Sequence, residues 1–333
     1  MDFFTGPSKH TWQPIMTADT TTSSYWLNWR VLLCSIWILV SLVFASFLVS
    51  KYECPRKNSR KKSRETLEDS PGTLYQDEVW KPCLNTIHPA WLLGLRVVAF
   101  IVLLLMLILN IVVDGGDIMY YYTQWTFTLV TIYFGLGSLL SMYGCYQYQH
   151  RVGNRNEDVE PGSRFETSRV KNFGPNEEHG RQLASFWSYA FQIIFQMNAG
   201  AVLLTDCVFW FVIVPFLAIK DYSLNFLIIN MHSINAVFLL AETALNSLRF
   251  PWFRIAYFFL WTNCYVIFQW IVHACIALWW PYPFLDLSSP YAPVWYSSVA
   301  LLHIPCYGLF VLIMKLKHFL LSKWFPESYH SAR

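Results

Sequence analysis

Three histidines lie inside long apolar stretches of this chain, where an ionisable side chain is costly and typically has a function. They are His232, His273 and His303. Each lies about six to nine residues from the same end of its stretch, which predicts a depth of roughly 9 to 14 Å at 1.5 Å per residue. A neutral imidazole can take a proton from a hydroxyl group, so this depth is a candidate site for acid–base chemistry.

Other polar side chains are predicted at the same depth. Asp206 precedes His232 in the neighbouring stretch, and Asn235 follows His232 by about one helical turn. Thr123 and Thr126 are three residues apart and therefore share a helix face. Each type also has an ordinary structural role, since a threonine often bonds the carbonyl one turn back and a histidine often bonds a neighbouring helix. Their co-location favours a site.

Soluble-enzyme and metal chemistry find little support in the motifs. The three histidines could hold a metal, but they lack the i, i+3 or i, i+4 spacing typical of histidine ligands. There is no phosphate-binding loop and no dinucleotide fingerprint in the sequence. We therefore expect no metal, no cofactor and no nucleic acid.

The composition indicates a membrane protein. Of the 333 residues, 55% are hydrophobic, 18% aromatic and only 14% charged, whereas a soluble domain has roughly a quarter charged residues. Stretches of about 18 apolar residues are long enough to cross a hydrocarbon core about 30 Å thick. Seven such spans are predicted, at residues 31–50, 91–113, 123–147, 193–216, 225–247, 255–279 and 294–314. The segment 182–192 is amphipathic, as a stretch along the interface before the chain turns inward would be, and it is counted with the fourth span as one crossing.

Basic residues set the orientation, because short loops rich in Lys and Arg stay in the cytosol. Only Lys9, Arg30 and Lys220 fall on one side, which leaves 21 of the 24 basic residues on the other. The N-terminus is therefore predicted outside or in a lumen and the C-terminus in the cytosol. The fold class is an all-α polytopic transmembrane bundle of about seven helices.

The chain divides at the spans. We predict a polar tail (1–26), a first transmembrane helix (27–50), a basic disordered linker (51–90), helices two and three (91–147), a second disordered linker (148–182), helices four to seven (183–314) and a cytosolic tail (315–333). Near the cytosolic side, Glu242 and Arg249 are seven residues apart and are interpreted as a structural pair or an anchor. Trp279, Trp280, Tyr282 and Trp295 are interpreted as interfacial anchors.

One stretch resembles a known family. Residues 270–286, WIVHACIALWWPYPFLD, look like the Trp, His and Tyr-Pro-Phe-Leu-acidic signature of the androgen-induced and androgen-dependent membrane hydrolases. Residues 230–235, NMHSIN, resemble the histidine helix of that family and of its relative, rolling stone. Residues 251–254, PWFR, look closest to plant members of the rolling-stone-like branch. The resemblance covers residues 91–314 and implies a six-helix core, with the first span as an extra N-terminal helix.

The resemblance also implies an activity. Members of the wider family are described as intramembrane threonine hydrolases that act on fatty acid esters of hydroxy fatty acids. Their essential histidine corresponds to His232, and their threonine corresponds best to Thr123, with Thr126 as second choice. Rolling-stone-like proteins are instead linked to membrane or cell-fusion roles.

The implied chemistry is coherent, because a threonine hydroxyl needs an adjacent base. His232 would be the base and Thr123 the nucleophile. Asn235, Gln124 or His273 could supply hydrogen bonds to an oxyanion, and Asp206 could orient an imidazole.

Two functions stay open. One is a hydrolase of lipid fatty acid esters, and the other is a non-catalytic protein that binds lipid or acts in membrane or cell interaction. Either would have membrane lipids as partners, in the endoplasmic reticulum, another endomembrane or the plasma membrane. A receptor or a transporter is less favoured, because the predicted outer loops contain no cysteine and no inverted repeat appears. The sequence leaves the oligomeric state open.

Overall fold

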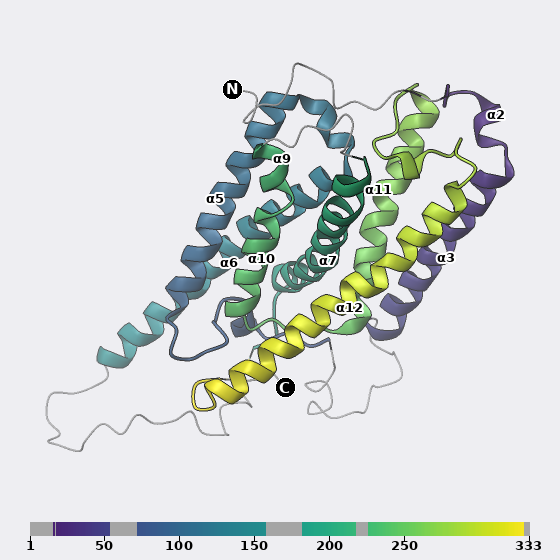
Figure 1. Ribbon diagram of the computed structural model, residues 1–333. Helices are drawn as coiled ribbons and strands as arrows, with labels where there is room; N and C mark the ends of the chain where they lie inside the picture. Colours follow the sequence, from purple (N-terminus) through teal and green to yellow (C-terminus); the bar gives the residue numbers. More distant parts are fainter. Residues whose placement is uncertain (1–15, 17, 54–71, 158–181, 218–225, 330–333) are drawn as a thin grey trace, which may run out of the picture.

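The computed structural model describes residues 16, 18–53, 72–157, 182–217 and 226–329, and over these ranges the chain is helical and forms no strand (Figure 1). Seven helices are long and apolar enough to cross a membrane. The predicted all-α polytopic bundle is confirmed, and the chain is a multi-pass membrane protein.

The crossings are built from the following elements: α3 (Trp29–Tyr52), α5 (Pro89–Asp114), α6 (Tyr122–Glu157), α7 (Phe186–Val208) with the π-helix η4 (Phe209–Leu217), α9 (Phe226–Met231) with α10 (Ile234–Leu245), η5 (Trp252–Arg254) with α11 (Ile255–Cys275), and α12 (Ala292–Trp324). Short helices lie between them: α2 (Ser23–Trp26), η1 (Gln76–Val79), η2 (Gly116–Tyr120) and η6 (Pro283–Leu285).

Local sequence explains where several of these helices begin. The side chain of Asn28 accepts hydrogen bonds from the backbone N–H groups of Arg30 and Val31 at 2.9 and 3.2 Å, which caps α3. Pro89 opens α5, where its missing N–H costs nothing. The apolar runs that follow bury one face and leave the rest of the surface to lipid.

Helix α7 lies inside the bundle and contacts α6, α11 and α12, whereas α5 pairs with α6 (Figure 1). Helix α3 packs on α11 and α12 at the rim, as an addition to the other six crossings. A close approach joins α7 and α11 at Gly200, where a Cβ atom would overlap the ring of Phe258. A glycine is therefore required there by packing.

Both ends of the first crossing are tied to the later part of the chain. At one end the Tyr25 phenol donates to Asp286 Oδ1 at 2.9 Å and accepts from Trp280 Nε1 at 2.9 Å. Burial and the Asp286 carboxyl raise the pKa of Tyr25. At the other end Arg254 Nε donates to Glu53 Oε1 at 2.6 Å.

Buried charges gather at the end of the bundle that the basic residues assign to the cytosol. Arg96 and Glu242 form an ion pair at 2.5 Å with both side chains fully buried. Arg249 instead pairs with Glu78 at 3.1 Å. The expectation that Glu242 pairs with Arg249 is therefore wrong, because the two side chains point to different neighbours.

Two predicted boundaries also differ. Residues 186–192 form the first turns of α7, where Gln192 is buried, so the fourth crossing begins earlier than residue 193. The described part of the first predicted linker packs against the helices and buries Leu74, Val79 and Trp80. The basic run 56–64 lies outside the described residues.

Candidate functional site

Thr123 lies in the first turn of α6, directly after the short helix η2. Its side chain is buried, and its hydroxyl lies 3.2 Å from the phenol oxygen of Tyr282, which also lies 3.4 Å from its backbone nitrogen. Burial raises the pKa of Tyr282, so this phenol stays neutral and can donate a hydrogen bond. The hydrogen-bonding partner of the Thr123 hydroxyl is thus a tyrosine, not a histidine.

Thr126 lies one turn further along α6 and is fully buried. Its hydroxyl interacts with the phenol of Tyr122, one turn back on the same helix. The ordinary role of a membrane threonine, bonding the carbonyl one turn back, is filled on the same helix by Thr131, which donates to Phe127 O at 2.9 Å. Thr126 makes no such bond.

Gln124 connects the start of α6 to the histidine segment. Its amide Nε2 lies 2.7 Å from the sulfur of Met231, and Asn110 of α5 approaches the same sulfur at 3.8 Å. The residue after Thr123 therefore touches the residue before His232. The Gln124 Oε1 atom is buried and has no partner among the described residues.

His232 lies at the break between α9 and α10, where the fifth crossing is interrupted. Its ring stacks on Phe209, with centroids 3.7 Å apart and planes inclined by 3°. The indole N–H of Trp210 donates to the His232 carbonyl at 3.0 Å, which gives a hydrogen-bond partner to one backbone carbonyl at the break in the helix. Phe209 and Trp210 belong to η4, and π-helices are frequent at functional sites.

Asp206 faces this imidazole from the last turn of α7. Its Oδ1 atom lies 3.7 Å from His232 Nδ1, which is longer than a hydrogen bond. Asn235 lies beside the Asp206 carboxyl, and its own Oδ1 accepts from the Ala236 N–H at 2.8 Å. His232 Nδ1 is buried and has no hydrogen-bond partner among the described residues. Such groups are rare in folded proteins and call for an explanation.

His273 has a different environment. Its ring nitrogens lie 2.7 Å from Gln269 O and 3.3 Å from Trp279 O, and its ring stacks on Trp280 at 3.7 Å. These contacts hold the loop after α11 in place. Trp279 and Trp280 are buried around this histidine, so the interpretation of these two as lipid-facing anchors is wrong.

His303 bonds a third set of groups. Its Nδ1 atom lies 2.8 Å from Val299 O, and its Nε2 atom lies 2.8 Å from the hydroxyl of Thr262. The Thr262 hydroxyl in turn lies 2.8 Å from the Tyr122 phenol. The three histidines thus have separate partners, and the described residues contain no group of three metal-ligating side chains.

The arrangement brings together most of what the sequence marked and separates the rest. Gln124, Asp206, His232 and Asn235 lie around the junction of α6, α7 and the broken fifth crossing. Tyr282 was missed as a neighbour of Thr123, although its place inside the Tyr-Pro-Phe-Leu stretch was a signal.

Comparisons with family profiles, with curated proteins and with solved structures find no match to this chain.

Proposed function

We propose that this multi-pass membrane protein is a hydrolase of lipid fatty acid esters, with Thr123 as nucleophile and His232 as base. The observation that carries the proposal is a set of unpaired buried polar atoms. Among the residues marked by the sequence these atoms are Gln124 Oε1 and His232 Nδ1, which lie beside the pair formed by Asp206 and Asn235. An ester and a water molecule would supply the missing partners.

The reaction has two steps. The Thr123 oxygen attacks the ester carbonyl carbon while its proton passes to His232, and the bond to the alcohol breaks as the alcohol takes that proton. Water then attacks the acyl-threonine, gives a proton to the same imidazole, and releases the fatty acid. The Thr123 hydroxyl is regenerated.

Neighbouring groups support both steps. The Tyr282 phenol, 3.2 Å from the Thr123 hydroxyl, is a donor for the negative oxygen that develops on the carbonyl. Asp206, 3.7 Å from His232, would favour the protonated imidazole. Contact of Gln124 with Met231 holds the two reacting segments together. For reaction, Thr123 exchanges its bond to Tyr282 for one to His232.

Asn235 would serve the oxyanion as well, and Thr126 is the alternative nucleophile because it lies one turn beyond Thr123 on the same helix. A lipid substrate reaches the site from the bilayer that surrounds the seven crossings. The membrane is the endoplasmic reticulum, another endomembrane or the plasma membrane.

A second function is favoured by one contact. Because the Thr123 hydroxyl is bonded to Tyr282, it is already satisfied as a structural hydroxyl would be. A rolling-stone-like protein that binds lipid without turnover, or that acts in membrane or cell interaction, would keep this bond. It would tolerate loss of the hydroxyl at Thr123.

The deciding experiment measures hydrolysis of a panel of fatty acid esters by the purified protein in detergent. The variants are Thr123→Ala, Thr126→Ala and His232→Ala, each checked for folding by its thermal midpoint. Thr131→Ala on α6 is the matched control, because its hydroxyl bonds its own helix. Turnover abolished by His232→Ala and by one of the first two threonine changes, but kept in the control, supports the hydrolase. Folded wild-type protein without turnover supports the lipid-binding alternative.

A further inference from the structure

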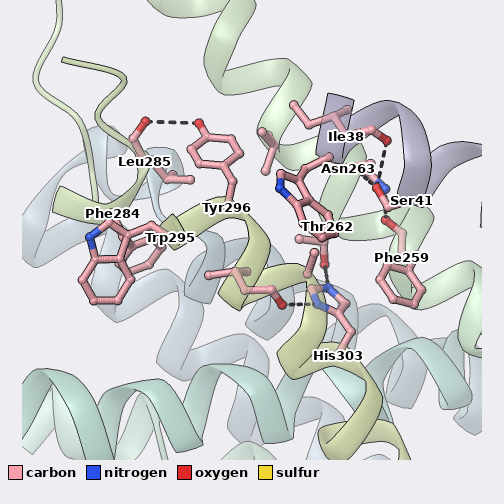
Figure 2. Close-up of a pocket in the computed structure, with 14 residues that line it drawn as sticks. Ile38, Ser41, Phe259, Thr262, Asn263, Phe284, Leu285, Trp295, Tyr296 and His303 are labelled. Atoms are coloured by element: carbon pink, nitrogen blue, oxygen red, sulfur yellow. Dashed lines mark hydrogen bonds between the residues drawn. The ribbon is translucent and has the colours of Figure 1, made fainter. Parts of the chain in front are cut away.

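A small cavity opens on the side of the bundle, between α3, α11, α12 and the loop that contains η6 (Figure 2). Its volume is about 50 Å³. An engineered apolar cavity of about 150 Å³ holds one benzene ring, so this one, about a third as large, admits only a short piece of a hydrocarbon chain. Of the residues marked by the sequence only His303 lines it, and Thr123 and His232 do not.

Two crossings with exposed apolar residues, α3 and α12, contribute to the cavity wall. Trp37 of α3 and Trp295 of α12 both line it, and Trp295 is 44% exposed. Phe284 and Leu285 form the wall nearest the loop. In a membrane the exposed edge of this cavity faces hydrocarbon, so the ligand that can reach it is a lipid chain.

Two polar groups on the cavity wall belong to a directed chain of hydrogen bonds. A carbonyl only accepts, so the His303 Nδ1 atom must donate to Val299 O, and Nε2 is then an acceptor. The Thr262 hydroxyl therefore donates to Nε2, and Tyr122 donates to Thr262. Every polar hydrogen in this series of hydrogen bonds is therefore already donated to an acceptor within it.

The second polar pair on the cavity wall, Ser41 and Asn263, has one donor without a partner among the described residues. Ser41 donates its hydrogen to Ile38 O at 2.8 Å and lies 3.0 Å from Asn263 Oδ1. Asn263 donates one amide hydrogen to Phe259 O at 2.8 Å, and its second has no partner among the described residues. Asn263 lines the cavity, so its spare N–H suits an oxygen that accepts a single hydrogen bond.

The depth of these groups restricts the ligand. Ser41, Asn263 and His303 lie twelve, twelve and eleven residues from the ends of α3, α11 and α12 at the loop side. At 1.5 Å per residue this is about 16 to 18 Å, close to the middle of a core about 30 Å thick. The ester carbonyls of ordinary membrane lipids stay near the headgroups, so they do not reach this donor.

We propose that the cavity binds one long hydrocarbon chain that carries a carbonyl oxygen part-way along its length. The chain enters between Trp37 and Trp295, and its oxygen accepts from Asn263 at mid-membrane. The site is separate from Thr123 and His232 and implies no reaction, so it goes beyond the proposed hydrolysis.

The test uses photoactivatable, alkyne-tagged C18 fatty acids added to the full-length protein in phosphatidylcholine vesicles, with labelled peptides mapped by mass spectrometry. One probe has a mid-chain ketone and the other has none, and a photoactivatable sterol is the third arm. We expect the ketone probe to label peptides of α3, α11 and α12 roughly three- to tenfold more than the plain chain, as one buried hydrogen bond allows.

Variants locate the effect. Asn263→Leu should remove the preference for the ketone, and Ala300→Phe, which fills the cavity, should remove labelling by both chains. Ser298→Phe is the matched control, because it adds the same ring to an exposed position of α12. If Asn263→Leu fails to fold, competition by unlabelled 10-oxo-octadecanoic acid against octadecanoic acid on the wild type replaces it.

Equal labelling by the two chains, labelling of other helices, or preferential labelling by the sterol would each overturn the proposal. Thr123→Ala and His232→Ala should bind the ketone probe as the wild type does, so failure of the hydrolase proposal leaves this result unchanged.

Discussion

Replacing Arg96 by methionine tests how the cytosolic half of the bundle is held together. Arg96 donates to Glu242 at 2.5 and 3.1 Å, to Val79 O at 2.9 Å and to Ser141 Oγ at 2.5 Å. In the variant the fully buried Glu242 carboxylate loses these bonds and keeps a hydrogen bond from the Tyr133 phenol at 3.0 Å.

The expected cost is about 3 to 5 kcal/mol of unfolding free energy, because an uncompensated charge stays buried. The double variant Arg96→Met/Glu242→Leu should regain most of that loss, since replacing a buried pair by apolar side chains is often neutral. Reversible denaturant unfolding in mixed micelles measures both. A loss below about 1 kcal/mol in the single variant, as for an exposed pair, would refute the reasoning.

Three further predictions concern single side chains. If Tyr282 stabilises the oxyanion, Tyr282→Phe should lower kcat on a hydrolysed ester about a hundredfold with little change in the thermal midpoint, and unchanged kcat would remove Tyr282 from the mechanism. Gly200→Ala should destabilise by about 1 to 3 kcal/mol in a thermal melt, because the new methyl group overlaps a phenyl ring of α11, and a wild-type midpoint would contradict that packing. Because the pKa of Tyr25 is raised in the folded protein, its contribution to stability is complete below about pH 10 and is lost at higher pH. The thermal midpoint should therefore fall above pH 10 less steeply in Tyr25→Phe than in the wild type. Parallel plots of midpoint against pH would exclude this residue.

The crossings could be predicted from the sequence because span length and apolar composition are properties of one segment at a time. All seven are present in the structure. Helix ends were less accurate: α11 ends at Cys275 and not at Trp279, because Trp279 folds back to bring its carbonyl to His273.

Partners across helices could not be predicted, because they depend on how each helix is rotated. The position of Arg96 near the cytosolic end of a predicted span is typical of a residue that sets membrane orientation. In the structure its side chain is instead fully buried against Glu242. A single sequence gives no signal that two charges 146 positions apart will meet.

The candidate site could be predicted from the sequence only in part. Similar sequence distances from the ends of the predicted spans suggested one layer of three histidines, but in the structure His232, His273 and His303 bond different neighbours. The proximity of the Thr123 and His232 segments was implied by resemblance and is consistent with the contact of Gln124 and Met231. The bond from Thr123 to Tyr282 depends on the loop conformation, which no periodicity encodes.

The ties of the first crossing have a consequence for biosynthesis. Tyr25 bonds a residue 261 positions later in the chain, and Glu53 bonds one 201 positions later. These bonds can therefore form only after α11 and the loop that follows it have been made. Until then the polar end groups of the first crossing lack their partners, and the side of the nascent bundle stays open. A chain that stops before Asp286 would therefore leave the Tyr25 phenol without this carboxyl partner.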